Sequence, residues 1–262
     1  MTSKTAVVVR KNTLPANWEQ QVKDDAARGR KQVANLGGSQ RLKTAGGILT
    51  YMDAPVPGNK LEGIVLAAAF ENAFYEGEYD PSNTTPPVCF AFAKSGDEDD
   101  SGMVPHPEAP KPQAKSCAAC PHNKFGSAEK GRGKACKNGV HLAVIHADAI
   151  KKKGGVDEAE VVTASVPPTS LPGYKGYVKQ MDQMSGNPSY AFVTEISLIP
   201  RQAGGFFMNL RPLKDVSKDK KLFGELFVKA KAAEKAVDER PPFPKAEDAK
   251  GGKPAAKKRK KY

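Results

Sequence analysis

Short apolar runs separated by turns fill most of the chain, and this pattern predicts a fold built mainly from β-strands. Runs bounded by Gly or Pro predict strands over residues 46–52, 61–70, 86–92, 140–145, 160–166, 191–199 and 206–210. Three other segments repeat apolar residues at helical spacing and predict helices over residues 15–35, 170–184 and 220–238. The pattern therefore favours an α+β class that is mainly β.

Three segments lack either pattern. Residues 94–116 carry four consecutive acids at 97–100 and several prolines, which predicts a flexible surface loop with a solvated charge run. Residues 1–14 predict a flexible arm. From Pro241 onward eight Lys/Arg stand against two Asp/Glu, a net charge of +6, and apolar residues disappear. We therefore expect one domain over residues 15–240 and a disordered basic tail over 241–262.

The chain has four cysteines, Cys89, Cys117, Cys120 and Cys136. Cys-x-x-Cys spacing is typical of a metal knuckle, a thioredoxin-like redox pair or two packed small side chains. The Gly-rich loop after Cys120 and the third cysteine beyond it favour a metal. We therefore predict a structural Zn²⁺ site with these four ligands, in which a histidine (His106, His122 or His141) could replace one sulfur.

Targeting signals are weak. The apolar run near the N-terminus is too short for a secretory signal, and the longest apolar run elsewhere, residues 64–70, is too short for a membrane span. We expect a reducing, cytoplasmic environment, where clustered cysteines more often bind metal than form disulfides. The Lys/Arg-rich tail also leaves nuclear import open.

The charge points to a polyanionic partner. Lys and Arg number 41 against 29 Asp and Glu, a net charge of +12. Aromatic residues lie among basic residues on several predicted strands and turns, a combination that binds single strands by stacking and phosphate contacts. Some of these aromatics could equally be core residues. The candidate nucleic-acid-binding residues are Arg41, Lys43, Tyr51, Tyr75, Tyr79, Lys124, Arg132, Lys134, Lys137, Tyr174, Lys175, Tyr177, Lys179, Arg201, Phe207 and Arg211.

Signatures of catalysis are missing from the sequence. It has no Walker loop, no Gly-x-Gly-x-x-Gly after a predicted strand, no Gly-x-Ser-x-Gly and no His-x-Glu deaminase motif. No general base accompanies the cysteines, which also favours structural over catalytic zinc. We expect a protein that is not an enzyme and has no small-molecule substrate.

Several motifs carry a family resemblance that spans roughly residues 45–200. They are Tyr75 to Tyr79, Pro86 to Phe90, Cys117 to Pro121 with Phe125 to Ser127, Gly133 to Lys137, and Val166 to Leu171. In these motifs the chain resembles phage and prophage zinc-containing OB-fold proteins that bind single-stranded DNA. In plan it is similar to the helix-destabilising protein of the large tailed phages, although that protein has a histidine ligand and an acidic tail.

The resemblance implies an OB-like five-stranded barrel with a four-cysteine zinc finger inserted at about residues 89–136 and helices flanking it. It also implies sequence-independent binding of single-stranded DNA in replication or recombination, in the host cytoplasm and together with other replication or recombination proteins. Two alternatives remain: a zinc-containing transcription or recombination factor acting on duplex DNA, and a protein-interaction module that binds no nucleic acid.

Overall fold

The computed structural model describes residue 17 and residues 20–24, 41–77, 85–94, 101–202 and 204–238. The chain divides into two compact units, residues 1–39 and 40–262. In the first unit residues 20–24 are helical, within the helix predicted over residues 15–35. The predicted arm, the acidic run, Tyr79 and the basic tail lie outside the described residues. None of the helices in the described part of the chain is long and apolar enough to cross a membrane.

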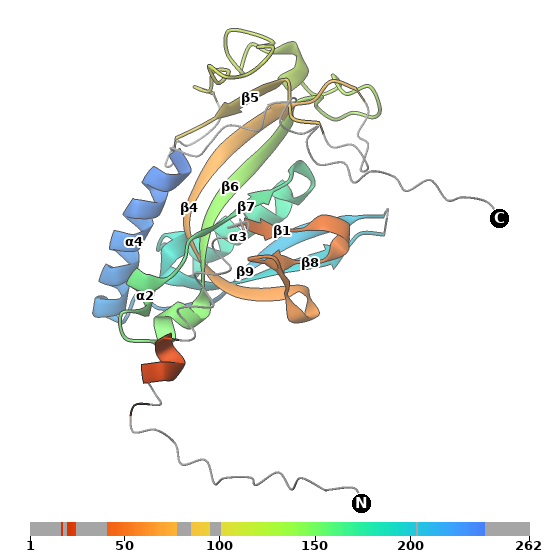
Figure 1. Ribbon diagram of the computed structural model, residues 1–262. Helices are drawn as coiled ribbons and strands as arrows, with labels where there is room; N and C mark the ends of the chain where they lie inside the picture. Colours follow the sequence, from red (N-terminus) through yellow and green to blue (C-terminus); the bar gives the residue numbers. More distant parts are fainter. Residues whose placement is uncertain are drawn as a thin grey trace, which may run out of the picture. The chain divides into compact units, whose positions relative to one another are not determined.

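The second unit is built on one sheet of nine strands (Figure 1). The strands are β1 Arg41–Lys43, β2 Thr50–Tyr51, β3 Ala54–Pro55, β4 Lys60–Phe74, β5 Cys89–Phe92, β6 Lys137–His146, β7 Val162–Val166, β8 Phe192–Pro200 and β9 Phe206–Asp215. Their order across the sheet is β3-β2-β1-β7-β6-β4-β8-β9, and β5 pairs with the end of β4. The expected α+β class, mainly β, is confirmed.

Within the described residues of the second unit, three α-helices accompany the sheet: α2 Gly155–Glu158, α3 Leu171–Met184 and α4 Lys220–Asp238. The helices predicted over residues 170–184 and 220–238 are thus confirmed. Pro172 stands in the first turn of α3, where its missing N–H costs no intrahelical hydrogen bond. Asp219 precedes α4, and its carboxylate accepts a hydrogen bond from the N–H of Leu222 at 3.1 Å, which caps the helix start.

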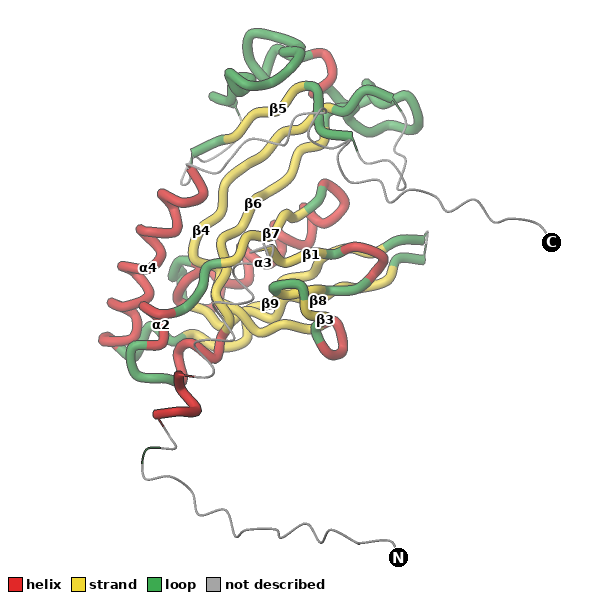
Figure 2. Tube along the Cα trace, in the orientation of Figure 1, coloured by secondary structure: helices red, strands yellow, loops and turns green. Residues whose placement is uncertain are grey.

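Strand β4 organises the sheet. Its central run from Ile64 to Phe70 is apolar, because both faces of the strand are covered by other parts of the unit. It pairs antiparallel with β8 at its start, with β6 along most of its length and with β5 at its end. A register shift between Val65 and Ala67 marks a bulge, which bends a strand. Figure 2 shows β4 and β6 as a long curved pair.

Five strands, β7-β6-β4-β8-β9, follow one another across the sheet, and each neighbouring pair is antiparallel. Helix α3 lies in the chain between β7 and β8. Strand β1 pairs parallel with β7 at one end of this path. At the other end, the Phe206 ring lies so close to Gly47 that a Cβ there would sit 2.2 Å from it. The two ends of the sheet therefore approach each other, and the sheet curls into a half-barrel.

Two apolar cores lie on opposite faces of this curled sheet. The inner core includes Leu142, Tyr177 and Phe192, and α3 packs against β9 beside it. The outer core includes Ile64 and Leu226, because α4 covers part of the outer face of β4 and β6. The inner core thus fills the half-barrel, and α4 packs against its outer face.

Two expectations about strands need correction. The sheet has nine strands where a five-stranded barrel was expected, because the short strands β1, β2 and β3 continue the sheet beyond β7, at one end of the five-strand path, and β5 pairs with the end of β4. The prediction of a single strand over residues 46–52 is also wrong. Gly46 and Gly47 have φ of 62° and 77°, and Met52 has φ of 49°, so the backbone turns on both sides of Thr50–Tyr51, the two residues that form a strand.

Candidate functional site

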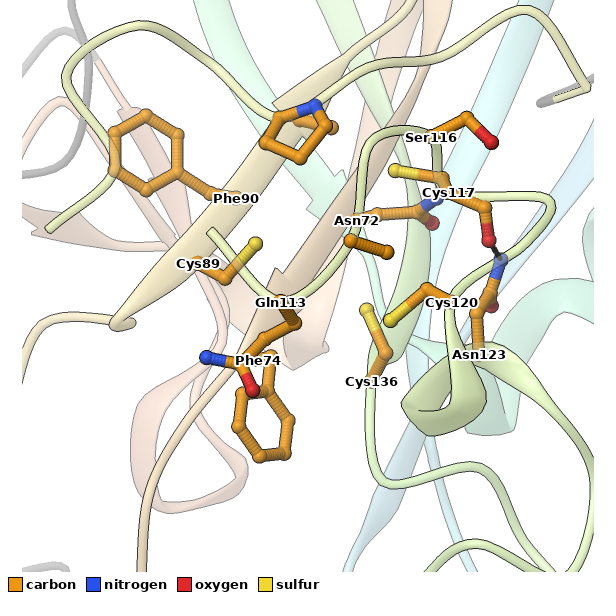
Figure 3. Close-up of a pocket in the computed structure, with 13 residues that line it drawn as sticks. Asn72, Phe74, Cys89, Phe90, Gln113, Ser116, Cys117, Cys120, Asn123 and Cys136 are labelled. Carbon is orange, nitrogen blue, oxygen red and sulfur yellow. Dashed lines mark hydrogen bonds between the residues drawn. The ribbon is translucent and has the colours of Figure 1, made fainter. Parts of the chain in front are cut away.

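Four cysteines from separate parts of the chain meet beside the end of β4. Cys89 opens β5 and lies opposite Phe74 of β4. Cys117 and Cys120 belong to residues 101–136, here called the cysteine loop, and Cys136 is its last residue. The four cysteines are 7–9% exposed. They line one pocket, and Figure 3 shows them around it. The structure thus places the four predicted metal ligands in the lining of one pocket.

Backbone hydrogen bonds hold the cysteine loop around this pocket. The N–H of Cys117 donates to the carbonyl of Met103 at 2.9 Å, and the N–H of Cys120 donates to the carbonyl of Cys117 at 3.3 Å. The N–H of Cys136 donates to the carbonyl of His122 at 2.9 Å. The two-residue spacing of Cys117 and Cys120 thereby forms a tight turn that places both side chains at the same pocket.

The first part of the cysteine loop runs along β5. Residues 101–116 contain no helix or strand, as their composition predicts. Yet the N–H of His106 donates to the carbonyl of Phe90 at 2.8 Å, and the N–H of Lys111 donates to the carbonyl of Val88 at 2.7 Å. Met103 is buried as well. This part of the predicted surface loop is therefore attached to the sheet by backbone bonds and apolar packing.

A chain of amide side chains connects the cysteine loop to the long strands. Asn138 of β6 donates through Nδ2 to Oδ1 of the buried Asn72 on β4. The same Nδ2 donates to Oδ1 of Asn123 at 2.9 Å, and Nδ2 of Asn123 donates to the carbonyl of Cys117 at 3.0 Å. Such a network fixes the position of its members, because each buried polar group has a partner.

The cysteines are free thiols that influence one another. Burial, together with the neighbouring thiols of Cys117, Cys120 and Cys89, raises the pKa of the Cys136 thiol to about 12, while Lys134 opposes this shift. Burial also raises the pKa of Cys89. The thiols of Cys136 and Cys89 therefore resist ionisation on their own. A bound divalent cation reverses this preference, because it stabilises each thiolate directly.

The donor set at the pocket suits zinc. Four sulfurs are a common ligand set for a structural Zn²⁺ site. Among the residues that the structure describes, however, no three His, Cys, Asp or Glu side chains lie close enough together to hold a metal ion. The four-sulfur zinc site therefore stays a prediction, now with its four ligands around one pocket.

The alternative histidine ligands lie elsewhere, and none of them lines the pocket. His122 stacks on Phe74, with ring centroids 4.2 Å apart. His106 stacks on Phe90 at 5.2 Å. His141 lies on β6 with its Nδ1 3.7 Å from a carboxylate oxygen of Glu71. This placement favours Cys89 over a histidine as the fourth ligand.

Several predicted nucleic-acid-binding residues share the outer face of the curled sheet. Side chains alternate along a strand, and Leu42 of β1 and Val140 of β6 point into the inner core. Arg41, Lys43 and Lys137 therefore point outward, and all three are exposed. The Lys43 ammonium is engaged by a carboxylate oxygen of Asp53 at 2.6 Å; no described carboxylate pairs with Arg41 or Lys137.

Tyr75 and Tyr51, two aromatic residues predicted to bind nucleic acid, differ in their exposure to solvent. Tyr75 follows β4 and is 38% exposed. Burial raises the pKa of its hydroxyl, and the charges of Glu71 and Cys136 raise it further, which places this ring near the cysteine pocket. Tyr51 of β2 is half-buried, and its ring meets His146 edge-on with centroids 5.6 Å apart.

The second part of the cysteine loop is basic. Lys124, Arg132 and Lys134 belong to it, and Lys137 follows directly in β6. Lys124 and Arg132 are exposed, and no carboxylate in the described ranges pairs with either. Lys134 is half-buried, and its Nζ donates to Oδ1 of Asn123 at 3.1 Å. The predicted loop cations are thus present beside the cysteine pocket, with Lys134 tied into the amide chain.

The remaining candidates lie on α3 and on β8 and β9, apart from the cysteine loop. Lys175 and Lys179 are exposed on α3, and Arg201 is exposed after β8. Phe207 is half-buried. Arg211 is exposed but lies 3.2 Å from a carboxylate oxygen of Glu195. The structure therefore does not gather all the predicted residues into one surface.

Tyr177 requires a correction. It is 1% exposed in the inner core, and its hydroxyl lies 2.9 Å from Oγ1 of Thr194. Tyr174, three residues earlier on α3, is half-buried against the same core. A buried ring has no face to offer a base, so Tyr177 is a core residue and not a nucleic-acid-binding one.

The candidate set omitted Phe125 of the cysteine loop, which the structure shows with 83% of its surface exposed. The Nζ of Lys134 lies 5.3 Å from the centre of its ring, within cation–π distance. The sequence did carry a signal, because Phe125 is the only aromatic residue in the basic stretch from 121 to 137. An apolar ring within a Lys- and Gly-rich loop has no neighbouring apolar residues to bury it.

Comparison with known proteins identified no relative of the chain. No family model, no curated protein and no solved structure matches the chain. The fold, the cysteine pocket and the basic surface around it are the features of the molecule that bear on its function.

Proposed function

We propose that this protein binds single-stranded DNA without sequence readout, and that a structural zinc ion holds the cysteine loop in its binding form. The observation that carries the proposal is the junction at Lys137. This residue is the first of β6, it points to the exposed outer face of the sheet, and it follows Cys136 of the pocket directly. The basic loop and the basic sheet face therefore adjoin each other.

The strand path supports an OB-like barrel as the scaffold. In an OB fold the first strand pairs with the second and the fourth, and a helix commonly lies between the third and the fourth. Here β4 pairs with β6 and β8, and α3 lies between β7 and β8. The cysteine loop then belongs to the connection between the first and second barrel strands, one of the loops that bind oligonucleotides in OB folds.

The strand pairing of this chain departs from that of an OB fold in one respect. In an OB fold the third and fifth strands meet to close the barrel, whereas here β1 pairs parallel with β7, the third strand of the path. Strands β1 and β2 therefore stand between β7 and β9 and widen the curled sheet. Arg41 and Lys43 of β1 extend the outer face beside β7, so the added strands bring further cations to the proposed binding surface.

Zinc has a structural role in this proposal. Cys117 and Cys120 would hold the ion from the tight turn, Cys136 from the last position of the cysteine loop and Cys89 from β5. When bound, the ion would supply charge to stabilise four thiolates and a cross-link between loop and sheet. The described pocket shows no carboxylate or histidine among its lining residues to act as a general base. We therefore propose a binding protein and not an enzyme.

Charge supplies most of the proposed affinity. The chain carries a net charge of +12, and each phosphate neutralised by Lys or Arg releases counterions. Exposed Lys124, Arg132 and Lys137 have no carboxylate partner within the described ranges. Contacts of this kind read the backbone and not the base sequence, which explains binding without sequence preference.

The direct test is a fluorescence-polarisation titration of the zinc-loaded full chain with a labelled single strand and with a duplex of equal length. We expect preference for the single strand and a steep loss of affinity between about 50 mM and about 200 mM salt. Preference for duplex would favour a duplex-binding transcription or recombination factor. No binding to either form would contradict the proposal and favour a protein-interaction module.

A charge-matched pair of variants locates the surface. Replacing Lys124, Arg132 and Lys137 with Gln should reduce the slope of log K against log salt by up to about 2, because each single-strand phosphate contact contributes about 0.7. The control replaces Lys218, Lys220 and Lys221 at the start of α4 with Gln, which removes the same charge elsewhere. An equal effect of both variants would mean that only net charge matters.

A further inference from the structure

Phe125 occupies the apex of a tight turn in the cysteine loop. The N–H of Ser127 donates to the carbonyl of Lys124 at 3.2 Å and closes a four-residue turn with Phe125 at its second position. Gly126, at the third position, has φ of 86°, which glycine adopts without strain. The turn therefore projects the Phe125 ring away from the loop, and the ring is 83% exposed.

Hydrogen bonds make this turn a fixed support. The N–H of Gly126 donates to the carbonyls of Arg132 and Gly133, at 3.2 Å and 3.0 Å. The hydroxyl of Ser127 donates to the carbonyl of His122 at 2.9 Å and accepts from the N–H of Ala135 at 3.0 Å. Phe125 is thus presented by a loop that is bonded across both of its arms, close to Cys136.

The charged residues around the Phe125 ring indicate which kind of ligand the ring can bind. Lys134 lies over the ring with Nζ 5.3 Å from its centre, and Asn123 holds that ammonium at 3.1 Å. Residues 121–137 contain five Lys/Arg and one Glu, so the ring stands in a basic surface. An isolated aromatic ring with cations around it is complementary to a nucleobase with its phosphates, and offers little apolar area to a protein core.

We propose that Phe125 stacks on an unpaired nucleobase and thereby makes binding selective for single strands. This inference rests on the proposed function. A base within a duplex is stacked on both faces and cannot reach a protruding ring, whereas a base in a single strand can. Lys134 fixes the ring, and Lys124 and Arg132 contact the phosphates on either side. Every base has a π-face, so the contact adds affinity without sequence readout.

The test compares single-strand and duplex binding of Phe125→Ala, Phe125→Leu and Phe125→Tyr in the zinc-loaded full chain. Phe125→Ala should weaken oligothymidylate binding about 5-fold to about 150-fold, with duplex binding and the salt slope unchanged. Phe125→Leu should be as weak as Phe125→Ala, and Phe125→Tyr should retain the affinity. Zinc content and unfolding midpoint should stay constant, because the ring is exposed. Phe227→Ala on α4, a second exposed phenylalanine, is the control.

A second readout follows the ring itself. Trp18 is the only tryptophan in the chain, so Trp18→Phe with Phe125→Trp places a single reporter at the turn. Its fluorescence should be quenched by oligothymidylate and not by duplex. Full single-strand affinity in Phe125→Ala would overturn the stacking role and leave the proposed function in place. Absence of single-strand binding by the unmodified chain would overturn both.

Discussion

The imidazole of His122 stacks on the ring of Phe74, with centroids 4.2 Å apart and planes inclined by 20°. This contact joins the cysteine loop to the last residue of β4. The carbonyl of His122 also accepts the N–H of Cys136 at 2.9 Å. His122 therefore connects the pocket to the sheet through its ring and its backbone.

Replacing His122 with Ala distinguishes a packing role of the imidazole from a metal-ligand role. The stacked pair contributes roughly 0.5–1.5 kcal/mol, so the variant should be less stable by about that amount in urea unfolding. Its zinc content should match that of the unmodified protein, because the imidazole does not line the pocket and the backbone carbonyl remains. Loss of zinc from His122→Ala would make this histidine a ligand.

Cys89 is the ligand that the sequence supports least, because it lies far from Cys117 along the chain. The structure brings it to the pocket through β5. Cys89→Ser should therefore reduce bound zinc from about one ion per chain to a small fraction, as measured by a chromogenic zinc assay after dialysis, since structural zinc sites use four ligands. Ser116→Ala, which alters another residue lining the pocket, should retain zinc. A Cys89→Ser variant with full zinc occupancy would exclude this cysteine.

The buried hydroxyl of Tyr177 predicts a stability effect without a binding effect. Tyr177→Phe removes the partner of the Thr194 hydroxyl, which is fully buried. An unsatisfied buried polar group costs about 1–3 kcal/mol, so urea unfolding should reveal a loss of that size. Single-strand affinity should not change. Weakened binding with unchanged stability would mean that the Tyr177 side chain reaches the nucleic acid.

Asp215 predicts a pH-dependent contribution to stability. Burial alone would raise the pKa of this carboxyl, but hydrogen bonds from Ser185, Ser217 and Asn187 outweigh it and lower the pKa from 3.8 to about 2. A lowered folded-state pKa stabilises the protein above the unfolded value, and this contribution disappears as the pH falls through the folded value.

Asp215→Asn should therefore be less stable than the unmodified protein at neutral pH. The difference should shrink between about pH 4 and about pH 2, as followed by urea unfolding at each pH. Comparing the two proteins at the same pH cancels the effects of every other group that titrates in both. A difference that is constant with pH would show that the Asp215 charge makes no contribution.

Long, regular segments of the fold could be predicted from the sequence. The apolar residues of α4 repeat at helical spacing along the whole helix, and the helix was predicted with its observed bounds. Strands β1 and β3 could not be recognised, because two or three residues are too few to show alternation. The position of β1 also depends on pairing with a distant segment, as in the parallel contact between Arg41 and Thr163.

The candidate site was predicted in part for similar reasons. Cys-x-x-Cys spacing is a local pattern, so Cys117 and Cys120 could be assigned together. Tyr174 and Tyr177 are three residues apart on one face of α3, and only the packing of that face against the inner core shows which ring is buried. The exposure of Phe125 depends on a turn closed by hydrogen bonds across the loop, which no local pattern encodes.

The central claim is that metal binding at the four cysteines supports single-strand binding by the loop and sheet. A chelator titration of the zinc-loaded chain, following zinc release and single-strand polarisation in the same sample, tests it most directly. We predict that affinity falls in proportion to zinc released and returns when zinc is restored, because metal binding and loop folding are coupled. Unchanged single-strand affinity after complete zinc removal would contradict the claim.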